Sequence, residues 1–247
     1  MQRYPASDLV IDPVLIRQYD VSGPRYTSYP TADRFVEAFG ETELRQWLAK
    51  RNIGGVSQPL SLYVHLPFCD TLCYYCACNK IVTRDRAKSS QYIKYLEKEL
   101  ALLEPSLGAN RSIGQLHWGG GTPTFLAREE MRALVDSICR RFERAPDCEC
   151  AIEIDPRSAG PGTMAFLAEL GFNRVSIGVQ DFDPQVQKAV HRIQSEAETR
   201  RVVGEARHAG FRSVNLDLIY GLPKQTLDGF NRTLDQVIAL DPDRIAL

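Results

Sequence analysis

The sequence predicts an α/β fold, a partial (βα)6-type barrel of the TIM kind that breaks off at the start of its sixth strand. From residue 61 onward, short apolar runs alternate with amphipathic helical segments at intervals of roughly thirty to forty residues, which indicates parallel βα units. The chemically distinctive residues follow the ends of the apolar runs, where such barrels carry their functional groups. We expect an N-terminal extension over residues 1–60 and the incomplete barrel over 61–247.

The composition is that of an ordinary globular protein. The 247 residues are 44% hydrophobic and 25% charged, and the formal net charge is −1, so nothing calls for a nucleic acid or an anionic membrane as partner. No apolar run approaches the length of a membrane span. The cysteines number seven, an odd count, and four of them fall within ten residues, a pattern that favours metal binding in a reducing compartment; we therefore expect a cytoplasmic protein.

The extension contains one good amphipathic helix, at 41–50, where Leu44, Trp47 and Leu48 share a face. The preceding segment, residues 22–35, is rich in Gly, Pro and Ser and reads as a loop. Its simplest interpretation is an extension that packs across the domain.

The predicted elements of the barrel follow in order. Strands are expected at 62–66, 114–118, 150–154, 175–179, 214–219 and 244–247, because each is a short apolar run rich in β-branched or aromatic residues. Helices are expected at 90–103, 128–142, 163–170, 195–208 and 227–240, where apolar residues recur at helical spacing. Turn-forming residues end or closely follow four of these strands: Pro67 the first, Gly119 the second, Pro156 the third and Gly221 the fifth.

A cysteine cluster follows the first strand. Cys69, Cys73 and Cys76 form a C-x3-C-x2-C pattern, and Cys78 lies two residues further on. A closed zinc site normally uses two separated C-x2-C pairs, whereas three thiolates on one loop can hold three irons of a cubane and leave the fourth open to a small molecule. Two alternatives remain: a zinc site completed by His65, and an incidental group of thiols.

The cysteine loop resembles that of the radical S-adenosylmethionine superfamily, in which an aromatic residue, here Tyr75, precedes the third cysteine. With YVHLPFC before it and NKIVTR after it, the extended motif is similar to one subgroup, the oxygen-independent coproporphyrinogen III oxidases, from Gly23 to the last residue. The resemblance implies a [4Fe-4S] cluster on Cys69, Cys73 and Cys76. It also implies S-adenosylmethionine on the open iron and an electron donor that reduces the cluster.

Further candidate residues lie at the ends of later strands. The GGGTP turn at 119–123 permits close approach of a ligand to the backbone, although a tight turn would look the same. Glu153 and Asp217 are charges within apolar strands, and Gln180 ends the fourth strand. Glu153 could instead face outward in a salt bridge, and Arg192 could be a cation on a helix surface.

The resemblance gives these residues roles in binding two molecules of S-adenosylmethionine. Tyr63, Gly120 and Glu153 are expected to contact the cluster-bound molecule. The second molecule is expected to contact Tyr75, Gly121, Thr122, Gln180, Arg192 and Asp217. The resemblance further implies that the 22–35 segment covers the mouth of the site.

The implied reaction is oxidative decarboxylation of two propionates of coproporphyrinogen III to vinyl groups, which gives protoporphyrinogen IX in haem biosynthesis. We expect a monomer. The resemblance stops at residue 247, before the rest of the barrel and the C-terminal helical domain of the family. We therefore expect either a fragment of a longer protein or a truncated form with impaired turnover. A haem-binding chaperone of the same superfamily is the alternative function, although Cys78 and GPRYTSYPT argue against it.

Overall fold

A computed structural model describes residues 12–21, 31–50 and 58–247, and it divides the chain into two compact units, Met1–Leu48 and Ala49–Leu247. The first unit contains α1 (Pro13–Tyr19), the short 3-10 turn η2 (Ala32–Arg34) and all but the last two residues of α2 (Glu41–Lys50). Helix α2 has the bounds that the sequence predicts. Residues 22–30 lie outside the described residues, so the role expected for the 22–35 segment stays a prediction, as does a domain boundary near residue 60.

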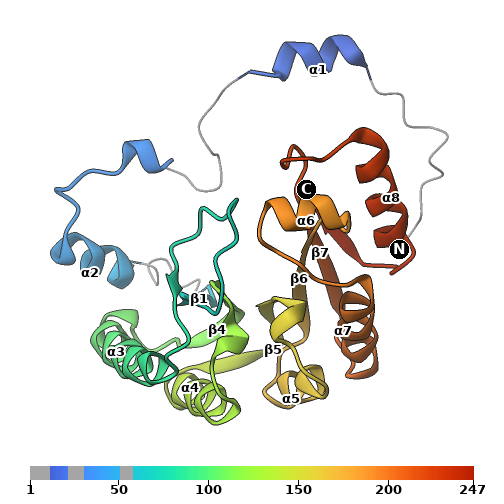
Figure 1. Cartoon of the computed structure of the whole chain (residues 1–247). Coiled ribbons are helices and arrows are strands. Elements are labelled where there is room, and N and C mark those ends of the chain that lie inside the picture. Colours follow the sequence, from blue (N-terminus) through green and yellow to red (C-terminus); the bar gives the residue numbers. More distant parts are fainter. Residues whose placement is uncertain (1–11, 22–30, 51–57) are drawn as a thin grey trace. The chain divides into compact units, whose positions relative to one another are not determined.

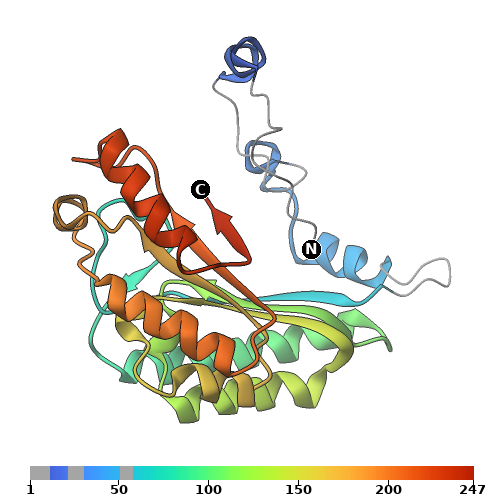
Figure 2. The same ribbon diagram turned by 90° about the vertical axis from the view of Figure 1, so that its right-hand side faces the viewer.

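The second unit is built on a six-stranded parallel sheet with the order β1-β4-β5-β6-β7-β8. Its strands are β1 (Leu60–Leu66), β4 (Ser112–Gly120), β5 (Glu143–Ile154), β6 (Arg174–Gln180), β7 (Ser213–Leu218) and β8 (Arg244–Ala246). Because each strand lies beside its predecessor, right-handed crossovers place the main connecting helices on the same side of the sheet. Figures 1 and 2 show the result, a curved sheet with helices around its outer face. This confirms the predicted partial barrel.

The helices of this unit are α3 (Ala87–Leu103), α4 (Arg128–Arg141), α5 (Thr163–Glu169), α6 (Pro184–Ala189), α7 (Glu196–His208) and α8 (Leu227–Ile238). The predicted helices agree within three residues at each end. Helix α6 is not among the predictions, because six residues are too few to show a helical period. It begins at an N-cap, since the Asp183 carboxylate accepts hydrogen bonds from the N–H groups of Gln185 and Val186.

Strand β5 begins seven residues before the predicted start. Pro146 argues against a strand in sequence reasoning because it cannot donate to the ladder. In the structure Glu143 and Arg144 pair with the start of β4, and the register shifts before pairing resumes at Glu149. An irregularity of this kind accommodates a proline inside the strand.

The core lies between the sheet and the outer helices. The sheet contributes Trp118, Ile152, Ile177 and Leu216, each 0% exposed. The helices contribute Leu134, Leu167 and Val202, also 0% exposed. Burial of these apolar side chains stabilises the curved sheet and so fixes the positions of the strand ends.

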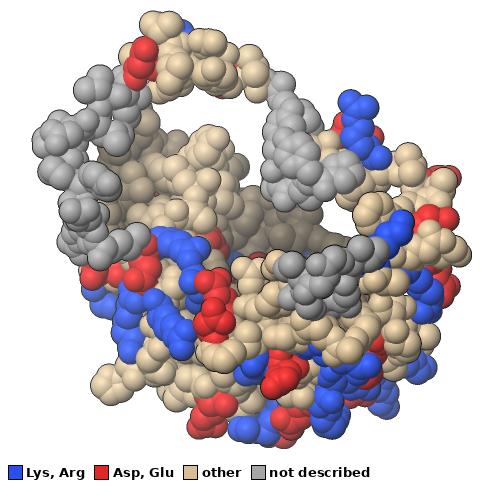
Figure 3. Space-filling model, turned by 180° about the vertical axis from the view of Figure 1, so that it is seen from behind, with Lys and Arg blue, Asp and Glu red and all other residues tan. Residues whose placement is uncertain are grey.

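The surface carries both signs of charge. Figure 3 shows Lys and Arg side chains interspersed with Asp and Glu side chains on the face it presents. Among the described residues, no helix is both long enough and apolar enough to cross a bilayer.

Candidate functional site

The loop that carries Cys69, Cys73 and Cys76 is closed at its base by a two-stranded ribbon of β2 (Phe68–Cys69) and β3 (Ile81–Val82). The Ile81 N–H donates to the Pro67 carbonyl at 2.7 Å, and the Thr83 N–H donates to that of Cys69 at 2.9 Å. These bonds bring the two ends of the loop together directly beyond the end of β1.

The tip of this loop is attached to the segment after α6. The Tyr74 N–H donates to the Val190 carbonyl at 3.0 Å, and Nδ1 of His191 lies 2.7 Å from the Leu72 carbonyl oxygen. The imidazole of His191 also stacks on Tyr74, with ring centroids 5.2 Å apart. The cysteine loop is therefore fixed at both its base and its tip.

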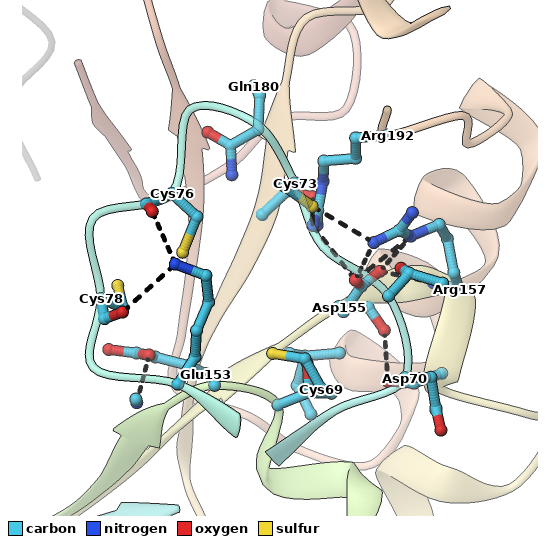
Figure 4. Close-up of a pocket in the computed structure, with 18 of the residues that line it drawn as sticks. Cys69, Asp70, Cys73, Cys76, Cys78, Glu153, Asp155, Arg157, Gln180 and Arg192 are labelled. Carbon is cyan, nitrogen blue, oxygen red and sulfur yellow. Dashed lines mark hydrogen bonds and ion pairs between the residues drawn. The ribbon is translucent and has the colours of Figure 1, made fainter. Parts of the chain in front are cut away.

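One cavity of about 420 Å³ lies at the carboxyl ends of the parallel strands. All the site residues predicted from the sequence, except Tyr63, line it: Cys69, Cys73, Tyr75, Cys76, Gly120, Gly121, Thr122, Glu153, Gln180, Arg192 and Asp217. Figure 4 shows several of them around the cavity, contributed by the cysteine loop and by the ends of β5 and β6. The barrel geometry therefore brings together residues that are far apart in sequence.

Tyr63 lies outside the residues that line the cavity, and its side chain is 54% exposed. Its hydroxyl is 3.0 Å from Nδ1 of His65, and its ring stacks on that of His117 with centroids 5.6 Å apart. Because His117 in turn contacts Glu153, Tyr63 reaches the cavity wall only indirectly.

Glu153 faces the cavity rather than the outside of the barrel. Its Oε1 lies 3.2 Å from Nε2 of His117, and its Oε2 accepts the Gly120 N–H at 3.0 Å. Burial raises the pKa of Glu153, but these hydrogen bonds outweigh it, so the pKa lies below its ordinary value. Gly120 has φ +114°, which an L side chain rarely adopts, and a Cβ there would meet the His65 ring at 2.6 Å.

Arg192 is buried, with 7% exposed, so it is not a helix-surface cation. Its Nη1 lies 3.1 Å from Oδ2 of Asp155, and its Nη2 donates to the Gly178 carbonyl at 2.8 Å. Asp155 also binds Arg157, and both arginines reach the sulfur of Cys73. Burial raises the pKa of Asp155, but the two guanidinium groups hold it below its ordinary value.

Gln180 and Asp217 stand at the ends of β6 and β7. Gln180 has φ 68°, an unusual conformation for a residue other than glycine, and such strain is often retained at binding sites. Both carboxylate oxygens of Asp217 lie 2.9 Å from the Ser176 hydroxyl, and Oδ1 accepts a hydrogen bond from Asn215 at 2.6 Å. Burial raises the pKa of Asp217 despite these hydrogen bonds.

Sequence reasoning missed several residues that line the cavity, among them Asp155, Arg157 and Ser176. Position in the sequence could have identified two of them, because Asp155 and Arg157 directly follow the third predicted strand. Cys78 also lines the cavity. Of the remaining cysteines, Cys148 and Cys150 are buried in β5 away from it, and Cys139 is exposed.

The sequence and the fold match a known class of protein. A family model described as the radical SAM superfamily matches residues 63–237, and the chain belongs to that superfamily. Membership implies a [4Fe-4S] cluster and S-adenosylmethionine as cofactors.

Within this class, the chain is similar to proteins named oxygen-independent coproporphyrinogen III oxidase. It is 53% identical over 238 residues to the protein of this name from Pseudomonas aeruginosa. The aligned residues cover 96% of this chain and 51% of the relative. It is 48% identical over 236 residues to that of Escherichia coli, covering 96% and 50% respectively. The chain thus spans about half the length of these relatives.

Solved structures give the same result. The chain superimposes on coproporphyrinogen III oxidase (HemN) from Escherichia coli with a TM-score of 0.85 and 44% identity, covering 94% of this chain and 52% of that one. It also superimposes on TsrM, a radical S-adenosylmethionine methyltransferase from Kitasatospora setae, with a TM-score of 0.53 and 15% identity over 75% of this chain. The second similarity supports the fold alone.

The residues present fit a cluster of this kind. Three thiols of one loop line a single cavity, and soft thiolate donors are the ligands that iron–sulfur clusters take. Among the residues that the structure describes, the buried Nε of Arg192 has no hydrogen-bond partner, so one N–H donor beside this cavity is free to bind a ligand. Within the described residues, no three His, Cys, Asp or Glu side chains converge on one single-ion position.

Proposed function

We propose that this chain carries the cofactor-binding part of an oxygen-independent coproporphyrinogen III oxidase, which decarboxylates two propionates of coproporphyrinogen III to vinyl groups and gives protoporphyrinogen IX in haem biosynthesis. The observation that carries the proposal is the shared cavity, where the C-x3-C-x2-C cysteines meet the residues at the ends of β4 to β7. The 53% identity to a relative with this name supports the choice of substrate.

Each residue of the site has a proposed role. Cys69, Cys73 and Cys76 would hold the [4Fe-4S] cluster, and two molecules of S-adenosylmethionine would bind beside it. The cluster-bound molecule would contact Tyr63, Gly120 and Glu153. The second would contact Tyr75, Gly121, Thr122, Gln180, Arg192 and Asp217.

The chemistry explains why a protein would need such a cofactor. The β-carbon hydrogen of a propionate is too weakly acidic for removal by a side chain at neutral pH. When bound, the reduced cluster and S-adenosylmethionine supply a carbon radical that can abstract this hydrogen. The protein residues would bind and orient the cofactors. The Glu153 carboxylate can accept hydrogen bonds from N–H groups, and Gly120 lets a ligand approach the backbone.

Three further properties belong to the same proposal. We place the protein in the cytoplasm, because unpaired cysteines suit a reducing compartment. We also propose that it is a monomer. A separate electron donor would reduce the cluster, and an electron acceptor would take the one electron that each propionate radical releases when it loses carbon dioxide.

Anaerobic reconstitution with iron and sulfide tests the cofactor proposal. We expect a [4Fe-4S] EPR signal after reduction, and a change in that signal when S-adenosylmethionine is added. Cys69→Ala, Cys73→Ala and Cys76→Ala should each lose the cluster, whereas Cys139→Ala, an exposed cysteine outside the cavity, should retain it. A normal cluster in all three loop variants would refute the assignment, and one equivalent of zinc without sulfide would exclude the cluster altogether.

Incubation with coproporphyrinogen III tests the reaction. Formation of protoporphyrinogen IX, dependent on S-adenosylmethionine and reductant, is the expected result. Stable binding of added haem without reductant, and no product, would favour the chaperone function instead.

A further inference from the structure

Two arginines lie against the sulfur of Cys73, whereas Lys80 contacts Cys76 at its backbone carbonyl, at 2.8 Å. Nη2 of Arg157 lies 3.7 Å from the Cys73 sulfur, and Nη1 of Arg192 lies 3.6 Å from it. The sulfur of Cys69, by contrast, has the neutral hydroxyl of Thr122 as its partner, at 3.7 Å. Within the described residues, neither Cys69 nor Cys76 receives a hydrogen bond at sulfur from an arginine or lysine.

Asp155 holds both arginines in place. It is the N-cap of the 3-10 turn η5 (Pro156–Ser158), and its Oδ1 accepts the backbone N–H of Arg157 at 3.0 Å. The same carboxylate binds the Arg157 side chain at two points, through Nε at 3.0 Å and through Nη2 at 2.6 Å. Bidentate pairs of this type fix the orientation of the guanidinium plane.

The group is also largely shielded from water. The side chains of Asp155, Arg157 and Arg192 are 13%, 23% and 9% exposed. Two guanidinium groups and one carboxylate give a net charge of +1 beside Cys73. Shielded charges are screened weakly, so this charge acts strongly on the sulfur.

We propose that Arg157, held by Asp155, donates a hydrogen bond to Cys73 and sets the reduction potential of the cluster. The inference rests on the cluster-binding part of the proposed function, and it assigns a role to two residues outside the predicted site. Hydrogen bonds to cluster sulfurs and nearby positive charge favour the reduced cluster, which carries one more negative charge. Arg157 tunes the cluster, and Asp155 is a positioning residue that acts through it.

Two substitutions of Arg157 separate its charge from its hydrogen bond. Arg157→Gln removes one positive charge and should lower the equilibrium constant for one-electron reduction on the order of tenfold, a fall of about 59 mV. Arg157→Lys keeps the charge but loses the bidentate pair, and its potential should lie between those of the wild type and Arg157→Gln.

The measurement is an anaerobic redox titration of the reconstituted full chain, followed by EPR without S-adenosylmethionine. Iron and sulfide contents are determined for every variant, so that only loaded protein is compared. Arg132→Gln is the matched control, because Arg132 pairs with Glu169 on the surface, away from the cavity, and its loss should leave the potential unchanged.

The outcomes separate this inference from the proposed function. If the wild-type chain takes up no [4Fe-4S] cluster, the proposed function fails. If the cluster forms but Arg157→Gln keeps the wild-type potential, only the tuning role is wrong. Should Arg157→Gln fail to load, Arg157→Lys decides, and a wild-type potential in that variant overturns the inference.

Discussion

Gly121→Ala is the sharpest test of how the end of β4 supports the cysteine loop. A Cβ at this position would lie 2.6 Å from the Phe68 carbonyl oxygen and 2.7 Å from the carbonyl carbon and oxygen of Pro67. All three are backbone atoms of the segment that leads into Cys69, so no side-chain rotation can relieve the contact. The Gly121 N–H also donates to the Leu66 carbonyl at 2.8 Å, which keeps the two strand ends close together.

The expected cost follows from this crowding. Forcing one extra methyl group into a packed position destabilises a protein by about 1–3 kcal/mol. For an m-value of about 2 kcal/mol/M, the urea midpoint should fall by about 0.5–1.5 M. The backbone around Cys69 must also move, so the variant should take up less iron on reconstitution.

Urea denaturation followed by circular dichroism, with iron analysis of the reconstituted protein, measures both effects. Gly160→Ala is the control, because a Cβ there would meet nothing within 4 Å. We expect the control to match or slightly exceed the wild type in stability, since alanine restricts the unfolded chain. If Gly121→Ala keeps both the wild-type midpoint and the wild-type iron content, the reasoning from close packing at this strand end is refuted.

Three further predictions concern the scaffold. Ile177→Ala empties a fully buried position in β6 and should cost about 2–5 kcal/mol of unfolding free energy, measured by urea denaturation. Thr226→Ala removes the N-cap of α8 and should cost about 0.5–2 kcal/mol in the same assay, whereas Thr226→Ser should retain most of the stability. Burial raises the pKa of Asp243, but hydrogen bonds from the Val214 N–H and Arg207 hold it below its ordinary value. The stabilisation from Asp243 is therefore present above its unfolded pKa and lost as pH falls through its folded pKa. Asp243→Asn should lose less thermal stability than the wild type over that acidic range. The same pH dependence of stability in the variant and the wild type would contradict this.

Much of the fold was predictable from the sequence because the sheet is parallel. Its strands read as short runs rich in apolar residues, because one face of each is buried under the helices. Helices α2, α4 and α7 show a clear helical period. Helix α6 and the first half of β5 were not predicted. Helix α6 is too short to show a helical period, and the first half of β5 contains Pro146, which local rules exclude from strands.

The cluster cysteines were also predictable, because Cys69, Cys73 and Cys76 are neighbours in the chain and their spacing is a local property. Arg157 was not predictable as a partner of Cys73, since 84 residues separate the two and nothing in a single sequence reports the contact. The same holds for Arg192, which the sequence left open as a surface cation and which the structure buries against Asp155.

The sequence by itself determined the order of strands and helices, the cysteine loop and the class of chemistry, because these depend on local spacing and residue type. Only the tertiary structure decided which charges face the cavity and which sulfur they reach. The curvature of the sheet brings the ends of β4, β5, β6 and β7 to one cavity, and distances across it depend on packing throughout the barrel.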